Sequence, residues 1–188
     1  MFPIDEGEPN VNAPAVINIP LSALQKRTIQ VKRTVNMTRT GKIPSMSALV
    51  VVGNGDGVVG FGLGKAGEVQ EAVQKATDRA RRSMIRIERM ENRTVFGEIV
   101  QRWKRTEVVL RSRPPGFGNR ANWILHEMFQ CAGIRDISGK VKGSTTPLNV
   151  VRAGMLALQR QTGPEAIARN RGRKLVDIQA MYASVASR

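Results

Sequence analysis

The stretch from Gly60 to Ile87 reads GFGLGKAGEVQEAVQKATDRARRSMIRI, and its pattern decides the fold. It begins as a strand, passes through a glycine-rich turn that carries Lys65, and continues as a helix. The predicted helix covers residues 68–87 and would be about 30 Å long at about 1.5 Å per residue. Such a unit favours phosphate binding, because the unpaired N–H groups of a helix N-terminus attract anions. The phosphates belong either to a small cofactor, which would make the protein an enzyme, or to a nucleic-acid backbone.

The predicted helix has two distinct faces. Apolar residues recur at spacings of three or four and form a stripe that can pack on a sheet. Basic residues recur with the same period on a neighbouring face, and we place Glu71 and Asp78 further round, toward solvent. We interpret the basic face as a phosphate-binding surface. The stripe consists of Val69, Val73, Ala76, Ala80, Met84 and Ile87, and the basic face of Lys75, Arg79, Arg82 and Arg86.

The net charge of the chain indicates a polyanionic partner. Its 188 residues include 30 Lys and Arg against 15 Asp and Glu, a formal charge of +15, which suits nucleic acid better than membrane. No apolar run approaches the roughly 18 residues that a bilayer span needs. The single cysteine, Cys131, excludes an intrachain disulfide and is predicted to be a small core residue. The acidic start, MFPIDEGEPN, is typical of neither a secretory signal nor an Arg-rich transit peptide.

Three antiparallel strands lead into the helix. Residues 28–35 alternate apolar and polar side chains and predict a half-buried strand, and residues 45–52 predict a second strand after a polar turn. The sequence GNGDG at residues 53–57 predicts a hairpin, since Gly and Asn tolerate positive φ, and residues 58–63 form the third strand. The apolar faces are predicted to hold Ile29, Val31 and Val35 in the first strand and Met46, Ala48, Val50 and Val52 in the second.

A dinucleotide-binding enzyme is one interpretation of the glycine-rich turn. Gly62-x-Gly64-x-x-Gly67 matches the dinucleotide fingerprint, after a strand and before a helix. The context argues against it, because that fingerprint belongs to a βαβ unit with a parallel sheet. Glu88, at the distance where the ribose-binding carboxylate should end a second strand, lies instead at the end of the predicted helix.

The order β-β-β-α with basic residues along the helix looks like a double-stranded-RNA-binding fold, which reads backbone shape and 2′-hydroxyls rather than bases. Phe61 is the only aromatic residue between residues 20 and 90. Because single-strand binders display stacking platforms, we expect stacking not to be the main mode of this unit.

Residues 41–84, GKIPSMSALVVVGNGDGVVGFGLGKAGEVQEAVQKATDRARRSM, resemble without gaps the N-terminal half of the small-subunit ribosomal protein five family. The similarity includes the G-[KR]-x-x-x-aromatic opening, on which Gly41 and Lys42 fall, and the G-x-V-G-F-G-x-G-K-A core. Met46 stands where the family usually has an aromatic residue. This departure affects local packing and leaves the resemblance intact.

A second small α/β unit is predicted after the helix. GSTTPLNVVRA at residues 143–153 resembles a C-terminal signature of the same family, with Thr146 in place of its usual Asn. RPPGFGNRANW at residues 113–123 departs from bacterial members and resembles the organellar branch, which favours a mitochondrial origin. The predicted strands are Val95–Ile99, Glu107–Arg111 and Ile134–Val141, the helices Trp123–Cys131 and Leu148–Gln159, and residues 113–118 a loop.

The two ends of the chain are predicted to lie outside these units. Residues 1–24 carry several prolines and are expected to run extended, with a short helix over residues 21–27. Residues 163–188 form a basic tail, in which residues 163–174 are a linker and residues 175–182 a short helix.

The resemblance implies an α+β protein with a double-stranded-RNA-binding-like domain over residues 25–92 and a small α/β sandwich domain over residues 93–162. It implies a structural constituent of the small ribosomal subunit, in a mitochondrial ribosome or alternatively a bacterial or other organellar one. The implied partners are rRNA, mRNA near the entry channel, and small-subunit ribosomal proteins four and eight, with an influence on translation accuracy. A non-ribosomal double-stranded-RNA-binding adaptor is the other alternative.

We expect no catalytic residue, cofactor, metal site or membrane span. His126 is followed by Glu127, but no second His stands four residues on, so the metalloprotease motif fails. The predicted RNA-binding residues are Lys32, Arg33, Arg39, Lys42, Lys65, Lys75, Arg79, Arg82, Arg86, Arg113, Arg120, Lys140 and Lys142, and the glycines predicted to allow close backbone approach are Gly41, Gly60, Gly62 and Gly64.

Overall fold

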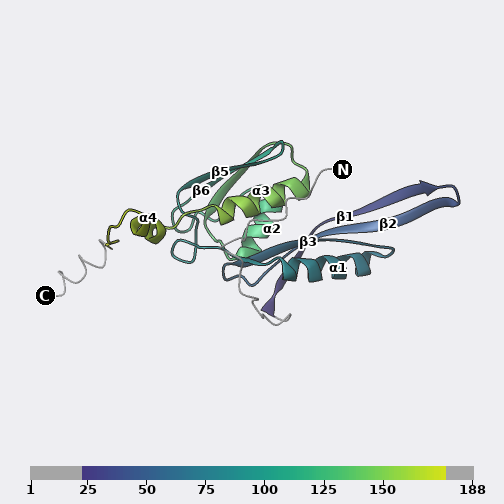
Figure 1. Cartoon of the computed structure of the whole chain (residues 1–188), viewed down its shortest axis with the longest axis horizontal. Helices are drawn as coiled ribbons and strands as arrows, with labels where there is room; N and C mark the ends of the chain where they lie inside the picture. Colours follow the sequence, from purple (N-terminus) through teal and green to yellow (C-terminus); the bar gives the residue numbers. More distant parts are fainter. Residues whose placement is uncertain (1–22, 177–188) are drawn as a thin grey trace.

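The computed structural model describes residues 23–176, which form two four-stranded sheets with helices packed against them (Figure 1). The predicted α+β class with two small sheet-and-helix units is confirmed. In chain order the elements are β1 (Gln25–Thr38), β2 (Gly41–Gly53), β3 (Val58–Ala66), α1 (Val69–Arg82), β4 (Ile85–Arg86), β5 (Glu98–Trp103), β6 (Thr106–Ser112), β7 (Asn119–Arg120), α2 (Trp123–Ala132), β8 (Ile137–Gly143), α3 (Pro147–Gln159) and α4 (Pro164–Asn170).

The first sheet has the order β1-β2-β3-β4 and is antiparallel throughout. Its β2–β3 hairpin turns at the predicted GNGDG sequence. On one face of β2 the buried Ala48, Val50 and Val52 pack with Ala72, Ala76 and Ala80 of α1. The predicted face of the second strand is therefore confirmed, and the small alanines let α1 lie close to the sheet.

The helix in this unit is shorter than predicted, and β3 is longer. β3 continues to Ala66, so Gly64 and Lys65 belong to a strand and not to a turn. Ser83 ends α1, since its hydroxyl donates a hydrogen bond of 2.8 Å to the Phe61 carbonyl oxygen in β3. Ile85 and Arg86 then pair with β3 as β4. The buried stripe is Ala72, Ala76 and Ala80, whereas the predicted Val69 is exposed and Met84 and Ile87 are buried outside the helix.

The β1–β2 hairpin extends beyond the rest of its sheet (Figure 1). β3 ends opposite Met46, so at the tip of the hairpin the residues from Thr34 to Ser45 pair only with each other. Val31 and Val35 are 43% and 45% exposed, and Ile29 is buried beside a β-bulge. The strand predicted over residues 28–35 is confirmed as part of β1, but the predicted burial of its apolar face is wrong beyond Ile29. The helix predicted over residues 21–27 is also wrong from Gln25 on, where β1 begins, and its start lies outside the described residues.

The second sheet has the order β5-β6-β8-β7, with α2 and α3 on one face. Val95 and Phe96 precede β5 and are not part of it, in contrast to the prediction. β7, which pairs with β8 in parallel, was not predicted. α4 occupies residues predicted to be a linker, and most of the helix predicted over residues 175–182 lies outside the described residues.

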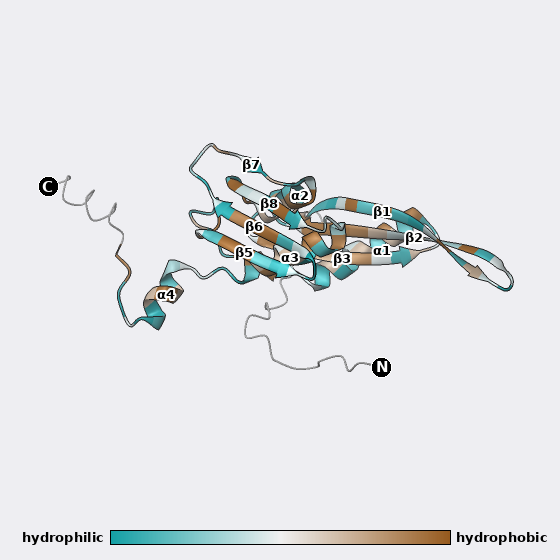
Figure 2. Ribbon diagram, turned by 90° about the horizontal axis from the view of Figure 1, so that it is seen from above, coloured by the Kyte–Doolittle hydropathy of each residue, from teal (hydrophilic) through white to brown (hydrophobic). Residues whose placement is uncertain are grey.

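One hydrophobic core connects the two sheets. Leu49, Val51 and Val59 point away from α1 and join a buried cluster that includes Phe129 and Cys131 of α2. Figure 2 shows α2 between the two sheets. The prediction that Cys131 is a core residue is confirmed, because the residue is fully buried. Within residues 23–176, none of the helices has the length and apolar character that a bilayer crossing requires.

Candidate nucleic-acid interface

The ribbon formed by β1 and β2 is basic along its whole length. Between residues 25 and 53 the chain has no Asp or Glu. Arg27 forms an ion pair of 3.4 Å with Glu127 of α2, and the other cations of the hairpin project from exposed positions. These free cations are Lys26, Lys32, Arg33, Arg39 and Lys42.

Cations of the ribbon project from both of its faces. Successive residues of a strand point to opposite sides, so Lys32 and Arg33 lie on different faces. The register supports this, because Arg33 is opposite Met46 and Lys32 is opposite Ser47. The ribbon can therefore contact polyanionic surfaces on two sides.

The basic residues of α1 are less uniform than predicted. The Arg79 guanidinium donates a hydrogen bond of 2.7 Å to the Leu63 carbonyl oxygen, and Lys75 forms an ion pair with Glu71. Glu71 is exposed to solvent, as predicted, but it pairs with a cation of the basic face and is not separate from that face. Arg86 belongs to β4, so the helix contributes three of the four predicted cations.

The glycines of β3 lie against α1. A Cβ atom added to Gly60, Gly62 or Gly64 would overlap with backbone atoms of α1, namely the carbonyl oxygens of Ala80, Ala76 and Ala72 respectively. Gly41, by contrast, has open space around it and a φ of +128°. The three strand glycines therefore allow close helix–strand packing, and the phosphate-binding turn that the dinucleotide interpretation requires does not exist.

The four predicted cations of the second unit lie in two separate places. Lys140 and Lys142 point from β8 away from the helices, and Lys142 forms an ion pair of 3.4 Å with Glu107. Arg113 and Arg120 instead flank the β6–β7 loop and contact Phe117, with distances from each Cζ atom to the ring centroid of 5.0 and 4.6 Å. Phe117 was not among the predicted residues, although the R-x-x-x-F-x-x-R spacing signals such stacking.

A buried carboxylate, also missed, holds this loop in place. Asp136 accepts hydrogen bonds from the Gly118 N–H at 2.8 Å and from the Arg93 guanidinium at 3.0 Å. The Gly118 N–H, and secondly Arg93, hold the pKa of Asp136 below its ordinary value of 3.8. The ionised carboxylate of Asp136 thus holds the β6–β7 loop in place through the Gly118 N–H.

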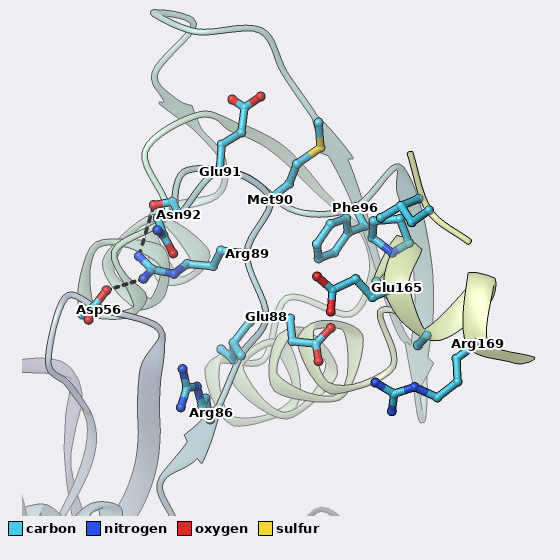
Figure 3. Close-up of a pocket in the computed structure, with 15 residues that line it drawn as sticks. Asp56, Arg86, Glu88, Arg89, Met90, Glu91, Asn92, Phe96, Glu165 and Arg169 are labelled. Atoms are coloured by element: carbon cyan, nitrogen blue, oxygen red, sulfur yellow. Dashed lines mark hydrogen bonds and ion pairs between the residues drawn. The ribbon is translucent and has the colours of Figure 1, made fainter. Parts of the chain in front are cut away.

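A polar cavity lies between the two units. It measures about 690 Å³, and Figure 3 shows Glu88 and Glu165 pointing into it. Beside it the nearly buried Arg89 donates hydrogen bonds to the Gly133 and Asn92 carbonyl oxygens, at 3.0 and 3.2 Å, and forms an ion pair with Asp56. These contacts give the cavity wall a structural role.

The described residues hold no group of three potential metal ligands. His126 has one acidic neighbour, with 3.6 Å between its Nδ1 atom and the carboxylate of Glu127. The site described here is therefore a set of cationic surfaces.

Comparison with known families accounts for both units of the chain. Residues 24–88 match the family described as ribosomal protein S5, N-terminal domain, and residues 101–171 match ribosomal protein S5, C-terminal domain. The chain belongs to the ribosomal protein S5 family. The resemblance stated from the sequence is thereby confirmed.

Curated relatives refine the position of this S5-family chain. It is 50% identical over 151 residues to small ribosomal subunit protein uS5m of Schizosaccharomyces pombe, which covers 80% of the chain and 39% of the relative. It is 46% identical to uS5m of Neurospora crassa, over 85% of the chain and 33% of the relative. Small ribosomal subunit protein uS5 of Phenylobacterium zucineum is 39% identical, over 88% of the chain and 85% of the relative.

The mitochondrial prediction is confirmed by the two fungal uS5m proteins, so this S5-family chain is assigned to the mitochondrial ribosome. The chain spans between a third and two-fifths of the length of these fungal relatives. Its relatives are ribosomal proteins and not enzymes, which excludes the dinucleotide-binding alternative.

Proposed function

We propose that this S5-family protein is a structural constituent of the mitochondrial small ribosomal subunit and binds rRNA through its phosphate backbone. The observation that carries the proposal is the β1–β2 ribbon, which projects beyond its sheet and carries exposed cations without a single carboxylate. Surface cations supply most of the affinity of such contacts, because they release counterions from the RNA.

The geometry of the ribbon suggests how it binds. Because Lys32 and Arg33 point to opposite faces, a ribbon placed between two rRNA segments would contact phosphates on both sides. Arg39 and Lys42, at the turn, would make the deepest contacts. Further contacts would come from the basic residues of the sheet and helix beside it, Lys65, Lys75, Arg79, Arg82 and Arg86.

The second unit would face other components of the subunit. We infer a domain boundary near residue 92, with residues 93–162 packing against ribosomal proteins four and eight. Arg113, Arg120, Lys140 and Lys142 would contact rRNA or mRNA near the entry channel. This position would let the protein influence decoding accuracy.

The salt dependence of RNA binding tests the role of the ribbon. Arg33→Gln, Arg39→Gln and Lys42→Gln are combined in one variant, and binding to a folded small-subunit rRNA fragment is measured by fluorescence anisotropy. The slope of log affinity against log salt should decrease in magnitude by about 2 to 3, since each lost phosphate contact is worth about 0.7 to 0.9.

A charge-matched variant controls for the change in net charge. Arg102→Gln, Arg105→Gln and Arg111→Gln remove the same number of exposed cations from the second unit. An equal loss of slope in both variants would show that the ribbon is not the binding site. Sedimentation of the protein with small subunits in a high-salt gradient separates the ribosomal proposal from a free double-stranded-RNA-binding adaptor, which would stay unbound.

A further inference from the structure

The β6–β7 loop presents two guanidinium groups on one aromatic ring. Arg113 and Arg120 lie over Phe117 with Cζ–centroid distances of 5.0 and 4.6 Å. The loop conformation depends on Gly116 and Gly118, whose φ angles are +82° and +80°. It is anchored by Asp136 through the Gly118 N–H, so the stack is held on a fixed backbone.

The charges of this stack are not neutralised within the described structure. Among residues 23–176, neither Arg113 nor Arg120 forms an ion pair, and the buried Nε atom of Arg113 has no hydrogen-bond acceptor. Two cations on one ring repel each other, so an anionic group close to them would stabilise the arrangement. A phosphate group carries the negative charge that this arrangement requires.

An exposed tryptophan follows the stack. Trp123 begins α2 three residues after Arg120 and is 55% exposed, although an aromatic residue of this size is usually well covered. Asn122 caps the helix at this point, because its side chain accepts a hydrogen bond of 3.1 Å from the Ile124 N–H. The cap fixes the backbone at the start of α2, from which the exposed indole projects.

We propose that the Arg-Phe-Arg-Trp surface, formed by Arg113, Phe117, Arg120 and Trp123, binds unpaired nucleobases of single-stranded RNA. Planar guanidinium groups and exposed aromatic rings are the groups on which unpaired bases stack, and the cations hold the adjoining phosphates. Bases within a duplex are already stacked and cannot use this surface. The inference rests on the proposed RNA-binding function and assigns a second, different RNA mode to the second unit.

The position of the surface agrees with a separate mode. β7, into which the loop leads, lies well away from the tip of the β1–β2 ribbon (Figure 2). The ribbon has exposed cations and no aromatic residue, whereas this surface combines both. The two surfaces should therefore respond to different RNA substrates.

Binding of two RNA probes to the full chain tests the proposal. The probes are a 12-nucleotide single strand without self-complementarity and a duplex of the same length, each measured by fluorescence anisotropy. Arg120→Lys keeps the charge but removes the planar group, and Trp123→Leu removes the ring. Each should weaken single-strand binding about tenfold, the order expected for one stacked base, and leave duplex binding within about twofold. The salt slope of Arg120→Lys should be unchanged, since its charge is retained.

Arg111→Lys, on the open face of the second sheet, is the matched control and should change neither affinity. Thermal unfolding followed by circular dichroism shows whether each variant is folded. If Trp123→Leu does not fold, the binding of Arg120→Lys alone tests the proposal. Duplex binding by the wild type, together with unchanged single-strand binding by both variants, would overturn this inference alone. Displacement of the single strand by poly-glutamate at similar charge concentration would overturn it in favour of an acidic protein partner. A wild type that binds neither probe would overturn the proposed function as well.

Discussion

The backbone N–H of Gly55 donates a hydrogen bond of 2.9 Å to the carbonyl oxygen of Cys131. The Gly57 N–H makes the same contact, also at 2.9 Å, with Ala132. The last carbonyl groups of a helix have no partner within the helix, so the turn of the first sheet caps the C-terminus of α2 in the second unit. Through this contact and the shared core, the two units should unfold together.

The close approach at Gly133 should make the cap sensitive to a single methyl group. Gly133 ends α2 with a φ of +73°, and an added Cβ would overlap with the Gly55 carbonyl oxygen. We expect Gly133→Ala to lower the free energy of unfolding by about 3 kcal/mol or more in urea denaturation, from backbone strain and overpacking together.

Gly97→Ala is the matched control for this prediction. Gly97 also has positive φ, +63°, but nothing lies within 4 Å of its added Cβ. Gly97→Ala should lower the free energy of unfolding by about 1–2 kcal/mol, because only the strain of a positive φ contributes. Equal losses for the two variants would show that the contact between the turn and α2 contributes nothing to stability.

Gly64 should tolerate no side chain, since an added Cβ would overlap with the Ala72 carbonyl oxygen. Gly64→Ala should lower the free energy of unfolding by about 1–3 kcal/mol, and Gly64→Val should lower it more and prevent assembly into subunits. Gly67→Ala, a few residues on and with open space, should be near neutral. Because the units share a core, Gly64→Val should destabilise both of them. A second unit that stays folded in this variant would contradict that coupling.

Arg89 should contribute more to stability than a surface arginine. Its side chain is 6% exposed and donates to carbonyl groups of both units. Arg89→Met would leave these acceptors without a donor, and we expect a loss of about 2–3 kcal/mol in urea denaturation. Arg86→Met, three residues earlier and exposed, should change stability by less than about 0.5 kcal/mol. Similar values for the two would refute the structural role of Arg89.

The anchor at Asp136 predicts a specific pH dependence. Because the Gly118 N–H and Arg93 lower the pKa of Asp136 in the folded protein below 3.8, its stabilising effect is complete above that value and is lost as the pH falls further. Asp136→Asn should therefore be less stable than the wild type between about pH 5 and 7, and the difference should narrow below pH 3.8. Urea denaturation at several pH values measures this difference in the free energy of unfolding. A difference that stays constant into acid would show that the carboxylate charge is not what anchors the loop.

Local sequence patterns correctly predicted those features that depend only on residues close to each other in the chain. The face of β2 at Ala48, Val50 and Val52 and the turn after Gly53 were correct, because alternation and glycine content act over a few residues. The boundaries of α1 were not predictable in this way. Its end depends on a bond from Ser83 to Phe61, which is 22 residues earlier in the chain.

The candidate interface, too, could be predicted only in part from the sequence. Net charge and the absence of carboxylates from the ribbon are visible in the sequence, and they indicate a polyanionic partner. The pairing of Lys75 with Glu71, the bond from Arg79 to Leu63 and the stack on Phe117 are visible only in three dimensions. They decide which cations remain available.

The sequence by itself determined the family, the order of the elements and the cationic character of the protein, because motifs and charge are carried by the residues themselves. Only the tertiary structure decided that the glycines from Gly60 to Gly64 face a helix rather than a phosphate. Only the structure, again, showed that a turn of one unit caps a helix of the other. The physical reason is that backbone donors and acceptors are the same in every residue, so their partners are determined by packing and not by side-chain type.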